Sequence, residues 1–167
     1  MGATVRRAAW LAKRIEQLTE GLAMVSVVVM VLATGYQVFG RYLLGRSPAW
    51  SEELARYLMV WLTFLGATAV LRSGGHLTVS AFFDVLATAG RRRLLWIRDA
   101  LMLSLCLTLC WASGQFAWLN RAQESAAMEI PMTVANGALT LGFGLLALQI
   151  VLARLAGMPF KAIGEGD

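Results

Sequence analysis

Residues 51–76 read SEELARYLMVWLTFLGATAVLRSGGH, a segment that opens with two glutamates and an arginine. An uncharged, mostly apolar run follows from Tyr57 to Leu71, and the segment closes on Arg72, a glycine pair and His76, the one histidine of the chain. A helix of about 20 residues crosses the roughly 30 Å hydrocarbon core of a bilayer. The pattern therefore predicts a membrane helix with a charged cluster at one end and a basic cap at the other.

Three further segments carry no charged residue, and each is long enough for a membrane helix: Gly21–Gly40, Ala100–Asn120 and Ile130–Ala153. The chain is 58% hydrophobic, compared with about 45–50% in soluble domains. Unbroken apolar runs favour helices over a barrel, whose strands alternate in polarity. We therefore predict an all-α integral membrane protein forming a single domain over residues 1–167. Its four transmembrane helices are predicted at about residues 21–43, 49–71, 97–120 and 131–153.

The positive charges are shared unevenly between the two sides of these predicted spans. Of the 15 Lys and Arg residues, 11 lie in the N-terminal segment, the loop between the second and third spans, and the C-terminal tail. Cytoplasmic loops are enriched in Lys and Arg, so both termini are predicted to be cytoplasmic. The net charge of +5 is then explained by contacts with membrane phospholipids, and no nucleic-acid partner is expected.

Residues 1–20 are basic and moderately amphipathic, which predicts an interfacial helix that leads into the first span. A cleaved signal peptide is the rival interpretation, because a basic segment precedes an apolar run. That run is about twice as long as many signal-peptide cores, and no clear A-x-A cleavage site follows it. We therefore expect the segment to be retained.

Residues 77–90 are predicted to form an amphipathic helix lying in the membrane interface between the second and third spans. Ser80, Asp84 and Thr88 repeat every four residues and would form a polar stripe, with phenylalanine, valine and leucine opposite. An arginine triplet follows directly. Its members, Arg91, Arg92 and Arg93, are predicted to anchor the chain to lipid headgroups.

The candidate interface residues come from the charged cluster and from small residues at helical spacing. Arg56 lies four residues after Glu52 and three after Glu53, so it can pair with either. This cluster is either a self-satisfied group of salt bridges or a docking patch for another subunit. Small residues allow close approach of helices in lipid. They form stripes at Thr63, Gly66 and Ala67, at Cys106, Cys110 and Gly114, at Ser104, Thr108 and Ala112, and at Asn136, Thr140, Gly144 and Ala147.

No catalytic constellation, cofactor site or metal site is expected. Two cysteines one helical turn apart and a single distant histidine make neither a disulfide nor a zinc site. A haem between helices would require two facing histidine ligands, and the chain has one histidine. A phospholipid transferase would require clustered aspartates, which the sequence lacks. The main alternative function is an autonomous small multidrug-type, proton-coupled exporter acting as a homodimer. Such exporters need a carboxylate inside a span, and the first span has none.

The stretch EELARYLMVWLTFLGATAVLRSGGHLTV resembles the DctQ-like small membrane subunit of tripartite ATP-independent periplasmic (TRAP) transporters. Pro131, at the start of the last predicted span, also fits the family pattern. The family often has an aspartate about four residues after the histidine, where this chain has Ser80, with Asp84 one turn later. The matching residues, which are the candidate partner-interface positions, are Glu52, Glu53, Arg56-Tyr57, Trp61, Gly66, Arg72 and His76.

The resemblance implies a non-catalytic permease subunit in the bacterial inner membrane. It would pair with a large multi-span subunit that moves its transport domain like an elevator, and would enlarge the static scaffold of that subunit. A periplasmic substrate-binding protein would deliver the solute, an organic acid such as a C4-dicarboxylate or sialic acid, for sodium-coupled uptake. The solute itself is not encoded in this chain.

Overall fold

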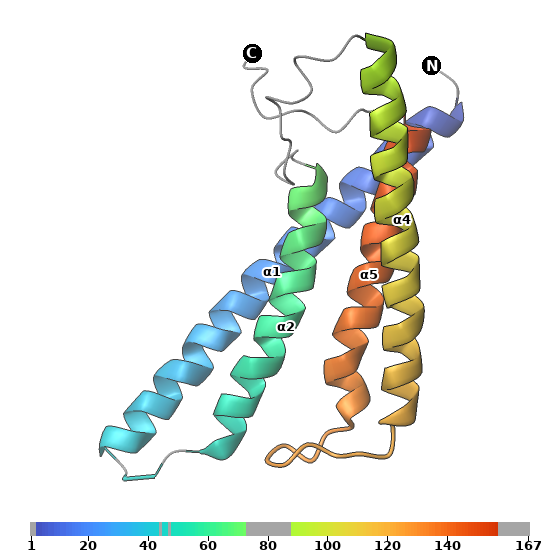
Figure 1. Ribbon diagram of the computed structural model, residues 1–167. Coiled ribbons are helices and arrows are strands. Elements are labelled where there is room, and N and C mark those ends of the chain that lie inside the picture. Colours follow the sequence, from blue (N-terminus) through green and yellow to red (C-terminus); the bar gives the residue numbers. More distant parts are fainter. Residues whose placement is uncertain (1–2, 44, 47, 73–87, 157–167) are drawn as a thin grey trace.

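A computed structural model describes residues 3–43, 45–46, 48–72 and 88–156. Within these ranges the chain is helical apart from its connections and one isolated β-bridge, between Glu124 and Pro131. The prediction of an all-α protein is therefore confirmed. The helices are α1 (Ala3–Leu43), α2 (Ala49–Arg72), α4 (Thr88–Leu119) and α5 (Met132–Leu155), as Figure 1 shows.

The four helices form an open row rather than a closed ring (Figure 1). α1 packs along α2, α2 packs along α5, and α5 packs along α4. The N-terminal part of α1 slants across the row and reaches the end of α5. Because the row does not close on itself, each helix keeps a broad side that no other described helix covers.

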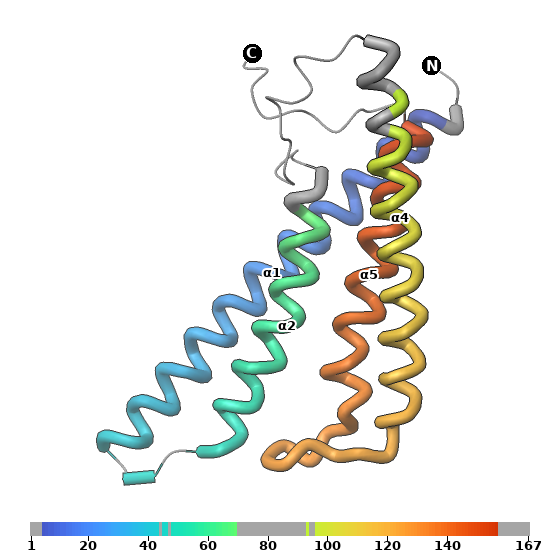
Figure 2. The backbone as a smooth tube through the Cα atoms, viewed as in Figure 1, coloured from blue at the N-terminus to red at the C-terminus, as the bar shows by residue number. Residues whose placement is uncertain are grey.

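The helix ends alternate along the row, so that like ends gather together. The start of α1, the end of α2, the start of α4 and the end of α5 lie at one end of the molecule (Figure 1). The α1–α2 and α4–α5 connections lie at the opposite end, which we call the connection end (Figure 2). The positive-charge count likewise placed the N-terminal segment, the loop between the second and third spans, and the C-terminal tail on one side of the membrane. Which end faces the cytoplasm stays a prediction.

Three helices are long and apolar enough to cross a membrane: Val5–Leu43, Trp96–Leu119 and Met132–Leu155. α2 is as long as α5, with 24 residues. Glu52, Glu53 and Arg56 in its first turns and Arg72 at its end make it less apolar. The crossing of the membrane by α2, predicted over residues 49–71, therefore remains a proposal.

The first helix is continuous, whereas the sequence predicted an interfacial helix followed by a separate membrane span from about residue 21. α1 runs without a break for 41 residues, which at 1.5 Å per residue is about 62 Å. Residues 3–20 of the predicted interfacial helix form the first half of α1, because no proline interrupts it and Gly21 alone does not end a helix. α4 also begins earlier than the predicted third span and includes Arg91–Arg93. The predicted interfacial helix at 77–90 lies mainly outside the described residues, apart from the start of α4 at Thr88.

Small residues set the close approach of α4 to α5. The thiol of Cys110 donates to the carbonyl oxygen of Thr140 at 3.3 Å, and a Cβ on Gly144 would lie 3.6 Å from the Cys110 sulfur. A Cβ on Gly114 would lie 3.6 Å from the Thr140 methyl group. The small-residue stripe that includes Cys110 and Gly114 is thus confirmed as a packing face.

The second predicted stripe of α4 packs on no described helix. Ser104, Thr108 and Ala112 are all exposed, and the two hydroxyl groups donate to carbonyl oxygens of their own helix at 2.9 Å. That prediction was therefore wrong within this chain. The reason is that the two stripes lie on different sides of one helix, and the open row gives α4 a single neighbour.

The approach of α2 to α5 depends on a glycine that the sequence did not single out. A Cβ on Gly142 would overlap the side chain of Phe64, so only glycine fits at this crossing. The Phe64 ring meets Phe143 edge-on with ring centroids 5.0 Å apart. Leu65 and Thr68 are buried along the same side of α2, and the Thr68 hydroxyl donates to the Phe64 carbonyl at 2.8 Å.

Candidate functional site

The start of α2 is built from its own first residues. Ser51 is fully buried, and its backbone N–H and hydroxyl both donate to the carbonyl oxygen of Pro48, at 3.3 and 2.7 Å. The buried Ser51 turn sets the direction in which α2 leaves the connection, and the next two residues, Glu52 and Glu53, are placed by it.

Glu53 joins the start of α2 to the α4–α5 connection. One carboxylate oxygen accepts a hydrogen bond from the Tyr57 hydroxyl at 2.7 Å. The other accepts from the backbone N–H groups of Ala127 and Met128, each at 2.9 Å. Three donors converge on this carboxylate, so they favour its ionised form and hold the connection against α2.

The connection that Glu53 holds has a defined shape. Ser125 is buried; its N–H donates to the Ile130 carbonyl at 2.9 Å, and its hydroxyl accepts from the Ile130 N–H at 3.3 Å. The Met132 N–H donates to the Gln123 carbonyl at 2.8 Å. Glu129 adopts φ +54°, an uncommon conformation for a residue with a side chain. These bonds make the 120–131 connection a compact turn whose exposed tip is fixed relative to α2.

Arg56 pairs with Glu52, which decides between the two pairings that the sequence allowed. The guanidinium lies 3.2 Å from the Glu52 carboxylate, and both side chains are about two-thirds exposed. Exposed i,i+4 pairs of this kind contribute little to stability, about 0.3–0.5 kcal/mol. Glu52 and Arg56 are therefore presented to the surroundings at the connection end, whereas Glu53 is engaged within the chain.

The remaining sequence-predicted positions are not brought together into one site. Trp61 is half-buried, and Gly66 faces open space, since a Cβ there would meet no atom within 4 Å. Arg72 is the last residue of α2 and His76 lies outside the described residues. Arg91, Arg92 and Arg93 lie in the first turns of α4, with Arg93 exposed. The charged cluster and the basic cap are thus at opposite ends of α2.

A buried charged cluster at the far end of the bundle was missed from the sequence. Asp99 of α4 is 5% exposed and forms an ion pair with Arg154 of α5. Arg98 also binds this carboxylate, through two nitrogens at 2.8 and 2.9 Å. The Arg154 guanidinium stacks over the Trp96 ring, 4.5 Å from its centroid. The signal available beforehand was that Asp99 and Arg154 each flank an apolar run, so an antiparallel helix pair brings them level.

Gln149 is a second residue that the sequence analysis passed over. Its side chain is 2% exposed, and its amide donates to the carbonyl oxygen of Ala12 at 3.3 Å. The bond lies beside the contact of Ala8 and Ala12 with Leu152 and Ala156. α5 is therefore tied to the first half of α1 by a polar bond as well as by apolar packing.

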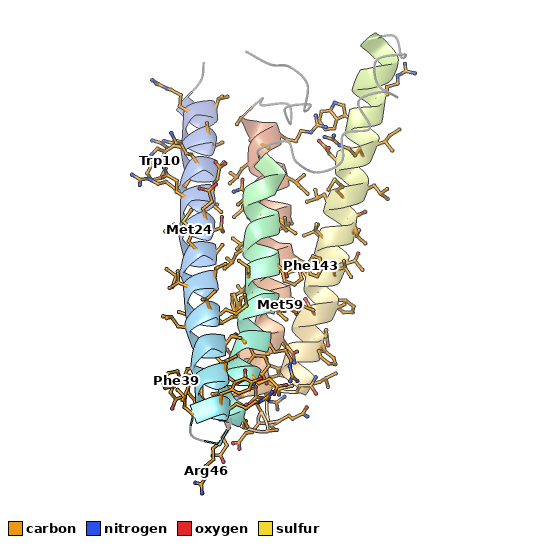
Figure 3. The ribbon with its side chains drawn as sticks, turned by 90° about the vertical axis from the view of Figure 1, so that its left-hand side faces the viewer. Trp10, Met24, Phe39, Arg46, Met59 and Phe143 are labelled. Atoms are coloured by element: carbon orange, nitrogen blue, oxygen red, sulfur yellow. The ribbon has the colours of Figure 1, made fainter. Side chains whose placement is uncertain are left out.

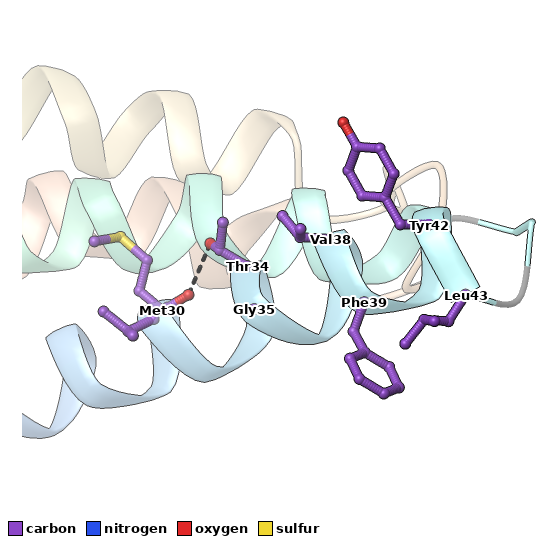
Figure 4. A pocket seen from close by; sticks show the side chains of 8 residues that line it. Met30, Thr34, Gly35, Val38, Phe39, Tyr42 and Leu43 are labelled. Atoms are coloured by element: carbon purple, nitrogen blue, oxygen red, sulfur yellow. Dashed lines mark hydrogen bonds between the residues drawn. The ribbon is translucent and has the colours of Figure 1, made fainter.

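The described residues offer no obvious place for a reaction. They contain no group of three or more His, Cys, Asp and Glu side chains able to hold a metal ion. An open, apolar hollow of about 670 Å³ lies on the outward side of α1 between Met30 and Leu43 (Figure 4). The Thr34 hydroxyl, one of two in its lining beside that of Tyr42, donates to the Met30 carbonyl of the same helix at 2.8 Å. Such a surface suits lipid tails or another helix.

The chain matches a known family over most of its length. Residues 30–158 fit the family model described as tripartite ATP-independent periplasmic transporters, DctQ component. That range includes α2, α4, α5 and the Glu53 contact with the α4–α5 connection. The match therefore covers the part of the molecule in which the candidate site is assembled.

Individual relatives agree with the family match. The chain is 28% identical over 95% of its length to the isethionate TRAP transporter permease protein DctMQ of Oleidesulfovibrio alaskensis, of which it spans only 25%. It is 25% identical over 89% of its length to the ectoine TRAP transporter small permease protein TeaB of Halomonas elongata, covering 78% of that protein. It is 27% identical over 90% of its length to a putative TRAP transporter small permease protein of Haemophilus influenzae, covering 92% of it.

These relatives are permease proteins, which is consistent with the expectation that the chain is not an enzyme. The three apolar helices agree with an integral membrane protein. The chain belongs to the DctQ component family of the tripartite ATP-independent periplasmic transporters, as a small permease subunit.

Proposed function

We propose that this chain is the static small subunit of a sodium-coupled importer of an organic acid in the bacterial inner membrane. It would support a large elevator-type subunit and perform no chemistry itself. The observation that carries the proposal is the open row of helices. A row buries only one or two sides of each helix, so its remaining apolar sides are free to extend the surface of a larger membrane partner.

The length comparison supports a separate large partner. The chain matches only 25% of the isethionate permease protein DctMQ, so most of that relative is additional permease chain. In our proposal a second, multi-span polypeptide supplies the corresponding part here. A periplasmic substrate-binding protein would deliver the solute, as in the family to which the chain belongs.

The class of solute is inferred from the relatives and not from this chain. Isethionate and ectoine, the solutes named for two relatives, are both small polar molecules that carry an acid group. A C4-dicarboxylate or sialic acid belongs to the same broad class. We propose an organic acid of this kind as the solute and sodium as the coupling ion, both bound by the large subunit.

In this arrangement the candidate residues have two roles. The exposed Glu52–Arg56 pair and the turn held by Glu53 form the partner-facing connection end, and Trp61 and Gly66 lie on α2 towards the partner. At the other end, Arg72, His76 and the arginines 91–93 meet the headgroups, with residues 77–90 as an interfacial helix and both termini cytoplasmic. α2 is then a fourth membrane span.

The test is co-purification of a tagged chain from its native membrane in mild detergent, with intact-mass analysis of the retained proteins. A near-equimolar, multi-span partner is the expected result. A homodimer that is active alone in liposomes would instead support the small multidrug-type exporter.

Gly66→Leu sharpens this test, because a Cβ added at this position meets no neighbouring atom within 4 Å. The variant is expected to fold normally and to retain less of the large subunit. Gly21→Leu, on an equally open position of α1, is the matched control. Unchanged partner yield and transport for Gly66→Leu would remove this glycine from the interface.

A further inference from the structure

We infer that the first half of α1 carries a binding surface for the phosphate headgroups of anionic phospholipids. This surface, called here the basic face, consists of Arg6, Arg7, Trp10, Lys13 and Arg14. Each of these side chains is exposed, and their spacing of three and four residues places them on one side of the helix. The inference is independent of the transported solute and of the identity of the large subunit.

Packing of the opposite side fixes the direction of the basic face. Ala8 and Ala12 are buried against Leu152 of α5 and against Ala156, which directly follows α5, and Thr19 is buried about two turns after Ala12. Because these residues point into the bundle, the basic face must point away from it. Figure 3 shows Trp10 on the side of α1 turned away from the other helices.

The same contact sets the depth of the basic face in the membrane. α5 has 24 residues, about 36 Å, so a helix crossing the roughly 30 Å hydrocarbon core reaches the headgroup layer with its last turn. Ala8 and Ala12 pack against that last part of α5. The neighbouring arginines and lysine of α1 therefore lie at headgroup depth rather than far out in water.

The outward side of α1 changes character along its length, as a helix leaving the hydrocarbon core should. Beyond Gly21 it presents exposed apolar residues, among them Met24, Val28 and Phe39, with 57–68% of each side chain exposed. Trp10 and Phe39 stand on the same outward side in Figure 3. The switch from basic to apolar on one continuous helix marks the boundary between headgroups and acyl chains.

The local chemistry suits a phosphate with an acyl chain beside it. The Arg14 guanidinium lies over the Trp10 ring, 5.4 Å from its centroid, which orients the group and leaves its edge N–H donors free for an anion. Exposed Leu11 and Leu18 flank these residues and offer apolar contact with lipid tails. The acids nearby are Glu16, which is half-buried, and Glu20, which is exposed at the membrane-facing end of this segment. A soluble polyanion would use the cations but would gain nothing from the tryptophan and leucines.

The experiment uses the purified full chain, with any co-purifying large subunit, in nanodiscs of phosphatidylcholine containing phosphatidylglycerol. Retained lipid is identified by native mass spectrometry after release from the nanodisc. The double variant Lys13→Gln with Arg14→Gln is compared with Arg41→Gln plus Arg46→Gln, which removes the same charge from exposed positions at the connection end. Each cation near an anionic surface is worth about fivefold in affinity, so the first variant should lose phosphatidylglycerol selectively.

A second readout locates the lipid. Quenching of tryptophan fluorescence by brominated phosphatidylglycerol should exceed quenching by brominated phosphatidylcholine, and Trp10→Phe should reduce that excess. Equal loss of phosphatidylglycerol in both charge variants would show that lipid retention depends only on net charge, and would overturn the proposal of a specific binding surface. Unchanged lipid retention in Lys13→Gln with Arg14→Gln, together with loss of the large subunit, would assign the basic face to a protein partner instead. Equal retention of both lipids by the unaltered chain would also overturn it.

Discussion

A carboxylate oxygen of Glu53 lies 2.9 Å from the backbone nitrogen of Ala127, a residue 74 positions further along the chain. With the adjacent Met128 N–H and the Tyr57 hydroxyl, this contact ties the start of α2 to the turn between α4 and α5. The start of α2 and the α4–α5 turn, 74 residues apart in the sequence, therefore form one connected end of the molecule. That end is the part of the molecule offered to a partner by the proposed function.

Glu53→Gln should loosen the α4–α5 turn. The neutral amide accepts hydrogen bonds more weakly than a carboxylate, so the Ala127 and Met128 N–H groups lose a charge-assisted acceptor. Faster hydrogen exchange at these two amides and earlier proteolysis within residues 120–131 are expected. Glu52→Gln is the matched control, because Glu52 forms an exposed ion pair with Arg56 and does not contact the turn. Equal exchange in the two variants would contradict the role given to Glu53.

Gly142→Ala should separate α2 from α5. The added methyl group overlaps Phe64, and overpacking of this kind costs about 1–3 kcal/mol of stability. Thermal unfolding in detergent measures the effect. Gly137→Ala adds the same methyl group on the same helix where no atom lies within 4 Å, and it should be neutral or slightly stabilising. If the clash is the cause, adding Phe64→Ala to Gly142→Ala should recover part of the α2–α5 contact.

Asp99→Asn should weaken the α4–α5 pair at the end opposite the connections. The buried carboxylate balances Arg154 and Arg98, and removing one partner of a buried ion pair costs about 3–5 kcal/mol. Both arginines keep roughly a quarter to a third of their surface in contact with the surroundings, so a loss of about 1–3 kcal/mol is expected.

Unfolding temperatures of Asp99→Asn, Arg154→Gln and the double variant give the coupling between the two residues. The double variant should lose less than the sum of the single variants. Additive losses would show that Asp99 and Arg154 do not act as a pair. Glu20→Gln, an exposed acid on α1, serves as a control for the change of charge alone.

Cys110→Leu and Ala112→Leu should behave differently although they lie only two residues apart. Cys110 faces α5 beside Gly144, so a leucine there forces the helices apart and lowers thermal stability by about 1–3 kcal/mol. Ala112 is exposed, so its leucine variant should fold normally. Under the proposed function Ala112→Leu then reports on partner contact, read as the yield of co-purified large subunit. Similar unfolding temperatures for both variants would contradict the assignment of sides on α4.

Local pattern was enough to predict the helices, because it depends on runs of residues that are adjacent in the chain. Charge-free segments located α1, α4 and α5, and small residues at fourfold spacing located the side of α4 that packs on α5. The same reasoning could not distinguish that side from the stripe at Ser104, Thr108 and Ala112, because both consist of small residues at the same spacing. It also placed a boundary near residue 20, where α1 continues unbroken.

By itself, the sequence determined that this is a helical membrane chain, since apolar run length and charge placement are local quantities, and the resemblance of residues 52–79 to a known family indicated the small-permease type. The tertiary structure alone decided that the helices form an open row, that Gly142 rather than Gly66 is the glycine of a tight crossing, and that Glu53 bonds to backbone amides rather than to Arg56. The physical reason is that a helix offers several chemically similar sides. Only the arrangement of its neighbours determines which side is buried and which donor reaches a given carboxylate.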